Sequence, residues 1–194
     1  MRQVLRLSVP ALCGALCLWL GLAGNAGAVS PKVVAGSEHS VALAADGRVL
    51  SWGSDNNGQL GLGRQVVETA PLLVPGVRAR SASGASALAA GTSFSVLVQS
   101  DGSVWTWGDN LIGQLGDGTG VARSAPVQVP DLSGVVQVAA GFAHVLALKN
   151  DGKLVAWGDN TSGALGYGLD WLPFLPSPWP VSGLTAVTAI SAGS

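Results

Sequence analysis

The chain has 194 residues, of which 10 are Lys or Arg and 11 are Asp or Glu, so its formal net charge is −1 at pH 7. This balance excludes the strongly basic surface that nucleic-acid binding uses. The 28 glycines, the 48% hydrophobic content and the few charged residues argue against a disordered chain and are typical of a compact, β-rich domain.

The first 28 residues have the layout of a secretory signal peptide. Two arginines precede an apolar run, Leu7–Leu22, and small residues follow up to Ala28. We predict cleavage after Ala28, and residues 29–194 then carry eight basic and eleven acidic side chains, a charge of −3. The apolar run is short for a bilayer span and contains a proline, so an uncleaved anchor is the less favoured alternative.

Cys13 and Cys17 both lie within this segment, so the predicted mature chain has no thiol and no disulfide. Neither cysteine follows the small-residue pattern that lipoprotein processing reads, and we expect no lipid anchor. The expected location is secreted, periplasmic or cell-surface, with no stable membrane insertion after cleavage.

The remaining chain is a repeat. The segments Arg48–Gly63, Ser103–Gly118 and Lys153–Gly168 each contain a Trp-Gly pair followed by regularly spaced glycines. The glycines that open successive units are Gly36, Gly91, Gly141 and Gly193, at separations of 55, 50 and 52 residues. A fixed period of this size indicates a repeat protein. We place the repeat region at 29–194, with units near 33–86, 87–135 and 136–186 and a partial unit at 187–194.

Each unit carries signals for four short strands. In the third unit Val136–Gly141, His144–Asn150 and Leu154–Gly158 are short segments that are β-branched or alternating, and Ala125–Val129 is such a segment at the end of the unit before. An Asp-Gly pair separates two apolar stretches in every unit, and it supplies the positive φ that a tight hairpin turn requires. Because no segment has sustained helical periodicity, we predict an all-β fold.

A repeat of about 50 residues with four antiparallel strands is the pattern expected of a β-propeller blade. The faces of one blade are covered mainly by its neighbours, so stability accumulates from unit to unit. The chain is predicted to form three blades and the first strand of a fourth.

The segment Ala35–Gly63 reads AGSEHSVALAADGRVLSWGSDNNGQLGLG, and on these residues the chain resembles the regulator-of-chromosome-condensation repeat family. The second unit departs from the family pattern with Phe94 in place of histidine, and the third with Ala164 in place of glutamine. The resemblance covers nearly all of residues 29–194 and implies a seven-bladed propeller. Since three blades fill less than half of such a ring, we expect part of a longer repeat protein. The alternative is that copies assemble head to tail through their open blade edges.

A tryptophan followed at once by glycine recurs at the end of one strand in every unit. These residues are Trp52, Trp107 and Trp157. A large ring that is repeated in all units is expected to fill the blade core. Stacking on a ligand is the alternative, and it requires that the rings be exposed.

His39 and His144 hold the repeat position that Phe94 holds in the second unit. Exchange with phenylalanine favours packing with a local hydrogen bond over catalysis or metal binding, and zinc needs about four converging ligands. The glycine-rich segments lack the lysine of a phosphate-binding loop, and there is no G-x-S-x-G nucleophile motif. We predict no catalytic residue, no metal site and no cofactor.

The loop after Gly166 breaks the repeat pattern. It reads YGLDWLPFLPSPWP and carries Trp171, Phe174 and Trp179 among prolines. Rigid aromatic side chains bury a large area at little entropic cost, so we predict these three as binding residues. The alternative is that they cover the propeller's own blade junction or channel mouth.

These observations predict a secreted, non-enzymatic scaffold that binds an extracellular or periplasmic protein, or a glycan. The segment Asp151–Asn160 is similar to units of a secreted bacterial propeller that inhibits β-lactamases, and this resemblance favours extracellular protein binding without naming the target. The nucleotide exchange that nuclear family members perform on a small GTPase is not expected of an exported protein. The alternatives are a lyase or hydrolase that uses a propeller channel, and a structural module of the cell surface.

Overall fold

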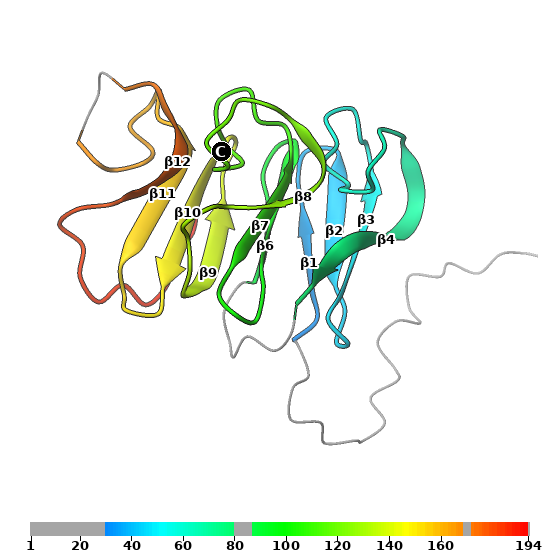
Figure 1. Cartoon of the computed structure of the whole chain (residues 1–194), viewed down its shortest axis with the longest axis horizontal. Coiled ribbons are helices and arrows are strands. Elements are labelled where there is room, and N and C mark those ends of the chain that lie inside the picture. Colours follow the sequence, from blue (N-terminus) through cyan, green and yellow to red (C-terminus); the bar gives the residue numbers. More distant parts are fainter. Residues whose placement is uncertain (1–29, 80–86, 169–171, 194) are drawn as a thin grey trace, which may run out of the picture.

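The computed structural model describes residues 30–79, 87–168 and 172–193. Its regular structure consists of three four-stranded antiparallel sheets, in which the strands follow one another in chain order (Figure 1). The first sheet contains β1 (Lys32–Ala35), β2 (His39–Leu43), β3 (Arg48–Gly53) and β4 (Glu68–Arg78). The second contains β5 (Leu88–Ala90), β6 (Phe94–Val98), β7 (Val104–Gly108) and β8 (Arg123–Gln128). The third contains β9 (Val135–Ala140), β10 (His144–Lys149), β11 (Leu154–Asp159) and β12 (Phe174–Pro180).

The predicted all-β fold with four antiparallel strands per unit is confirmed. The three sheets stand side by side like blades, with the first strands β1, β5 and β9 as neighbours (Figure 1). The predicted signal peptide, residues 1–28, lies outside the described residues.

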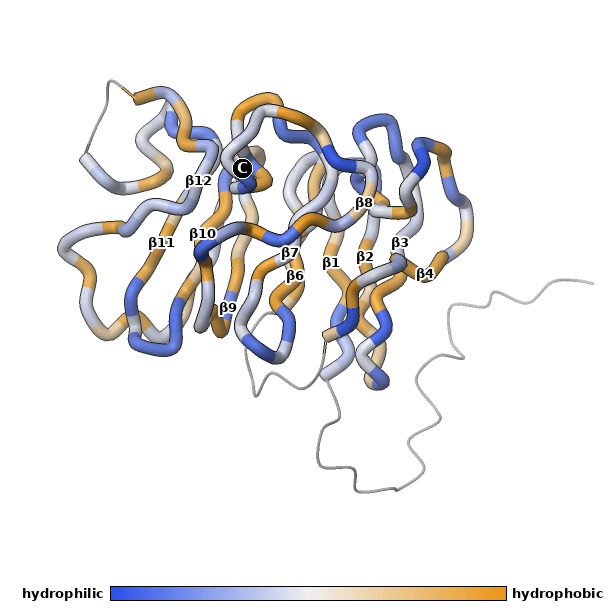
Figure 2. Tube along the Cα trace, viewed as in Figure 1, coloured by the Kyte–Doolittle hydropathy of each residue, from blue (hydrophilic) through white to orange (hydrophobic). Residues whose placement is uncertain are grey.

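One hydrophobic cluster runs through all three blades. Figure 2 shows apolar residues along the strands and hydrophilic residues at the hairpin turns. The predicted core role of the repeated tryptophan holds for Trp107 and Trp157, which are completely buried. Trp52 in the first blade is half-buried, because no described blade lies on that side of it.

In each Asp-Gly turn the glycine and the aspartate have different roles. Gly47, Gly102 and Gly152 take positive φ values of 84°, 77° and 76°. The aspartate that precedes each glycine does not. Instead its carboxylate accepts a backbone hydrogen bond from the residue two positions later, as Asp46 Oδ1 does from Arg48 N at 3.0 Å. The sequence therefore located the turn correctly, and the structure assigns the positive φ to glycine alone.

The loop after each Trp-Gly strand is held by one side chain. An Asp or Asn at its start accepts a hydrogen bond from the N–H of a buried leucine five residues later. The pairs are Asp55 with Leu60 (2.9 Å), Asn110 with Leu115 (2.9 Å) and Asn160 with Leu165 (3.2 Å). These contacts fix each loop on one face of its own blade.

Residues 187–193 lie at the place of the first strand of a fourth blade. The side-chain amide of Gln137 on β9 donates to the carbonyl of Ile190 at 3.1 Å. The carbonyl of Gly193 lies beside Gly141, as that of Gly91 lies beside Gly36. The segment forms no β-ladder with the described residues, because no second strand lies beside it there.

Candidate binding surface

Neighbouring blades are joined by a repeated hydrogen bond. The indole N–H of Trp107 in the second blade donates to the carbonyl of Gln59 in the first at 2.8 Å. Trp157 in the third blade donates in the same way to Gln114 in the second, at 3.0 Å. We call the blade face that presents the tryptophan the leading face, and the opposite face, which presents the acceptor loop, the trailing face.

The outer strand of each blade also binds the loop of the blade before it. Gly63 N donates to the carbonyl of Ser124 on β8 at 2.7 Å, and Gly118 N donates to that of Pro176 on β12 at 2.9 Å. The loop glycines allow this close approach, since a Cβ on Gly113 would lie 2.5 Å from Pro176 Cα. Each blade junction is therefore built from main-chain groups of one blade and a ring or strand of the next.

The junction between the first and second blades contains a buried polar chain. His39 Nε2 lies 2.9 Å from Ser95 Oγ, and this hydroxyl donates to the carbonyl of Gln59 at 3.1 Å. The histidine therefore donates through Nε2. Burial lowers the pKa of His39 to about 4, so its ring is neutral at pH 7. The predicted packing role holds for this buried histidine, whereas its hydrogen bond is not local, because it crosses the blade junction to Ser95.

Among the described residues, no blade covers the trailing face of the third blade, whereas the trailing faces of the other two blades are covered. Gly163 and Ala164 are exposed, whereas the corresponding Gly58, Gln59, Gly113 and Gln114 are buried. Leu146 on β10 is half-buried, while its counterparts Val41 and Val96 are completely buried. We call the trailing face of this blade the open face.

The structure separates two of the predicted binding residues. Trp179 pairs with Ala156 and Phe174 pairs with Asp159 on β11, so their side chains point to opposite faces of the outer strand β12. Trp179 lies at the outer rim of the open face, and Phe174 points to the other side. Both are exposed, by 54% and 42%. Trp171 lies outside the described residues.

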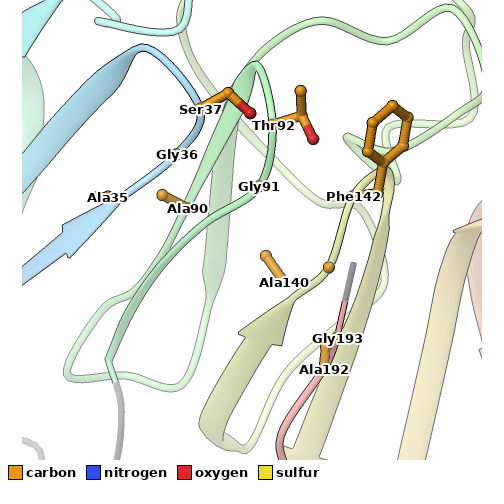
Figure 3. A pocket seen from close by; sticks show the side chains of 11 residues that line it. Ala35, Gly36, Ser37, Ala90, Gly91, Thr92, Ala140, Phe142, Ala192 and Gly193 are labelled. Atoms are coloured by element: carbon orange, nitrogen blue, oxygen red, sulfur yellow. The ribbon is translucent and has the colours of Figure 1, made fainter.

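The inner strands form a shallow groove of about 290 Å³ along the axis of the blades (Figure 3). Its lining repeats the residues that open each unit, Ala-Gly followed by Ser37, Thr92 or Phe142. Ser37 N donates to the carbonyl of Thr92, and Thr92 N to that of Phe142, both at 3.2 Å. Phe142 is 59% exposed. This groove presents backbone groups and small side chains, and no titratable side chain lines it.

No three His, Cys, Asp or Glu side chains of residues 30–79, 87–168 and 172–193 are grouped so that they could hold a metal ion. Within the same residues there is no helix with the length and apolar character that crossing a bilayer requires.

The sequence did not single out the open face or Phe142. Ala164 was noted only as a departure from the repeat, and Leu146 as part of a strand. The available signal was periodicity, because Leu146 and Ala164 are more exposed than their counterparts in the other units, on a face that no described blade covers. This comparison needs the burial of the other units, which the sequence does not contain.

The stacked four-stranded sheets and their tryptophan junctions define a β-propeller segment. The chain belongs to the regulator of chromosome condensation (RCC1) repeat family, whose model matches residues 46–98 and 101–148. A second model of the same repeat matches residues 32–59, 85–114 and 135–164.

Similar proteins include the E3 ubiquitin-protein ligase HERC2 of Homo sapiens, which is 41% identical over 95 residues, or 49% of this chain and 2% of the ligase. The ultraviolet-B receptor UVR8 of Arabidopsis thaliana is 35% identical over 99 residues, or 50% of this chain and 22% of the receptor. The chain thus spans a small part of these relatives.

Solved structures share the fold. The crystal structure of Kap60 bound to yeast RCC1 (Prp20) contains a chain that matches with a TM-score of 0.68 and 25% identity, over 84% of this chain and 39% of that one. Human WBSCR16 matches with a TM-score of 0.50 and 22% identity, over 85% of this chain and 56% of that one.

Proposed function

We propose that this chain is an exported, non-enzymatic scaffold that binds another protein outside the cytoplasm. The observation that carries the proposal is the outer strand β12, where Phe174 and Trp179 are exposed on a segment held by Pro173, Pro176, Pro178 and Pro180. Proline fixes the backbone before binding, so little conformational entropy is lost when these rings are covered.

The axial groove supports binding over catalysis. General acid-base or nucleophilic chemistry needs a titratable or activated side chain at the site, and the lining of this groove has none. Export is supported by the composition of residues 1–28, where two arginines precede an apolar run and small residues follow.

The test has two parts. In the first, the full chain is expressed with a C-terminal reporter that is active only after export, and deletion of residues 2–22 should abolish the reporter signal. A signal that persists after the deletion would overturn export.

In the second part, surface proteins and glycans of the producing cells are arrayed and probed with the wild type and with Phe174→Ala/Trp179→Ala. Leu111→Ala is the matched control, because Leu111 is an exposed apolar side chain on another loop. Protein binding that the double variant loses and the control keeps supports the proposal. Binding to glycans alone, or binding that both variants keep, contradicts it.

A further inference from the structure

We propose that Asn57 is a site of spontaneous deamidation, and that the closed junction between the first and second blades keeps it unreactive. Asn57 and Gly58 form the single Asn-Gly pair of the 194-residue sequence. This pair is the most reactive one in deamidation, because glycine has no side chain to hinder ring closure. The proposal is independent of the binding function above, because it concerns the chemistry of the chain's own loop.

The reaction begins at the main-chain nitrogen of Gly58, which attacks the side-chain carbon Cγ of Asn57. The nitrogen loses its proton, a C–N bond forms, and the side-chain amide leaves as ammonia. Water then opens the resulting succinimide ring. Addition of water at Cγ gives aspartate, whereas addition at the main-chain carbonyl carbon gives isoaspartate. In isoaspartate the main chain runs through the side-chain methylene and is longer by one carbon.

A hydrogen-bonded turn holds the attacking nitrogen in place. Gly58 N donates to the carbonyl of Asp55 at 3.1 Å. Neither Asn56 nor Asn57 has a positive φ, so this is a type I turn, in which ψ of Asn57 is close to zero. Ring closure requires a large rotation about the Cα–C bond of Asn57. This rotation breaks the hydrogen bond between Gly58 and Asp55.

The residue that follows the reactive pair ties it to the second blade. Asn57 N donates to Oε1 of Gln59 at 2.9 Å, and Gln59 is 2% exposed. The carbonyl of Gln59 accepts the indole N–H of Trp107 at 2.8 Å and the hydroxyl of Ser95 at 3.1 Å. Both donors belong to the second blade. The reactive pair is therefore fixed as long as these contacts are made.

Gly58 also packs directly against the second blade. It is buried, and a Cβ on it would lie 2.6 Å from the Cα of Ser124 on β8. The main chain of Gly58 has no room to rotate while this contact exists. Deamidation therefore requires the two blades to separate locally, and its rate follows the fraction of molecules in which they have done so.

The other two units show that the turn does not need asparagine at this position. Ile112-Gly113 and Ser162-Gly163 hold the places of Asn57-Gly58. Their glycines donate the same turn hydrogen bond, at 3.0 and 2.8 Å. Asn57→Ser, which copies the third unit, should therefore remove the reactive amide and keep the turn.

Conversion of Asn57 to isoaspartate should prevent the junction from closing again. The additional main-chain carbon precedes Gly58 and moves the carbonyl of Gln59 away from Trp107 and Ser95. A buried carbonyl that loses its donors destabilises the closed arrangement. Because deamidation is irreversible, the loop would record how often the two blades have separated.

The first experiment follows deamidation of the full chain at mildly alkaline pH, by peptide mapping and mass spectrometry. Asn57 should react more slowly in the native chain than in the urea-unfolded chain, by more than about tenfold. Asn57→Ser should give no product at position 57 under either condition.

The second experiment loosens one junction at a time. Trp107→Phe removes the indole donor to Gln59 and should speed the reaction of Asn57 by about five- to tenfold. Trp157→Phe is the matched control, because it removes the equivalent hydrogen bond to Gln114, at 3.0 Å, from the second junction. The control should react close to the wild-type rate, since separation at the second junction does not release Gly58.

The third experiment separates the two products of the aged wild type by chromatography and compares their thermal unfolding. The isoaspartate form, identified by enzymatic methylation, should unfold at a lower temperature than the unreacted chain. Asn57→Asp has the main chain of the other product and should unfold close to the wild type.

Each experiment has an outcome that contradicts the proposal. Equal rates in the folded and unfolded chains would mean that the junction gives no protection. Equal rates in Trp107→Phe and Trp157→Phe would overturn local control by the first junction. An isoaspartate form that unfolds like Asn57→Asp would show that the product does not hold the junction open.

Discussion

The indole N–H of Trp107 donates to the main-chain carbonyl of Gln59 across the first blade junction, at 2.8 Å. The same ring lies against Gly61, where a Cβ would come within 2.9 Å of it. One residue type thus fills the core of its own blade, closes a hydrogen bond to the preceding blade, and requires glycine in the loop that it contacts. This triple use explains why the Trp-Gly pair and the later glycines recur together.

Replacing Trp107 by phenylalanine should destabilise the fold by about 1–3 kcal/mol, because the variant loses the hydrogen bond to Gln59 and part of a buried ring. Trp52→Phe is the matched control. Trp52 occupies the same repeat position without an acceptor among the described residues, so a smaller loss is expected. Urea denaturation followed by circular dichroism measures both. Equal losses in the two variants would show that the inter-blade hydrogen bond contributes nothing.

Gly113→Ala should destabilise the chain more than Gly163→Ala. The two glycines have nearly the same φ, 73° and 72°, so the strain of a left-handed alanine, about 1 kcal/mol, is common to both. They differ in surroundings: a Cβ on Gly113 would lie 2.5 Å from Pro176 Cα, whereas one on Gly163 would meet nothing within 4 Å. The clash with backbone should add about 1–3 kcal/mol to the cost at Gly113. Thermal unfolding of the two variants gives the difference directly, and a difference near zero would mean that the blades move apart freely.

Stability should fall as the pH is lowered from 6.5 towards 4. The folded state protonates His39 only below its lowered pKa of about 4, whereas the unfolded state does so near 6.5. The unfolded chain therefore binds more protons in this window, and the loss attributable to His39 is roughly 3 kcal/mol. Burial also lowers the pKa of His144, which acts in the same direction.

The His39→Phe/Ser95→Val variant isolates the contribution of His39. It copies the Phe94 and Val145 pair of the second junction, so the core remains filled. Burial raises the pKa of Asp55, which acts in the opposite direction at the lower end of the window, and this effect is present in both proteins. The variant should show a clearly flatter dependence of unfolding free energy on pH. An unchanged slope would assign the pH dependence to other groups.

The repeat made the architecture predictable from the sequence. The spacing of glycines located the units, the Asp-Gly pairs located the hairpins, and the alternation of apolar residues located the strands. Gly47 and its counterparts take positive φ values, which glycine adopts without strain because it has no Cβ. These signals are local, so three copies of each gave the same answer independently.

The blade junctions were not predictable in the same way. Their acceptors are the main-chain carbonyls of Gln59, Ser124 and Pro176. Every residue type has such a carbonyl, so a sequence pattern does not reveal which ones accept. The opposed orientation of Phe174 and Trp179 was missed because this segment is expected from its sequence to be a loop. The structure shows that Phe174–Pro180 is a strand, and two residues five positions apart on a strand point to opposite faces.

Ala186→Gly should stabilise the chain. Ala186 has a φ of 56°, in the left-handed region, and lies beside the hairpin glycine Gly152. In the second blade the corresponding residue is a glycine, Gly134, which has a φ of 70° and lies beside the hairpin glycine Gly102. A left-handed alanine costs about 1 kcal/mol, and glycine removes this cost while it adds entropy to the unfolded chain, so the expected net gain is about 0.5–1 kcal/mol. Gly134→Ala is the reverse substitution and should destabilise by at least as much, since its Cβ would lie 3.2 Å from Asn150 Oδ1. Differential scanning calorimetry of both variants measures the two changes. A loss of stability in Ala186→Gly would mean that the alanine methyl makes packing contacts that outweigh its backbone strain.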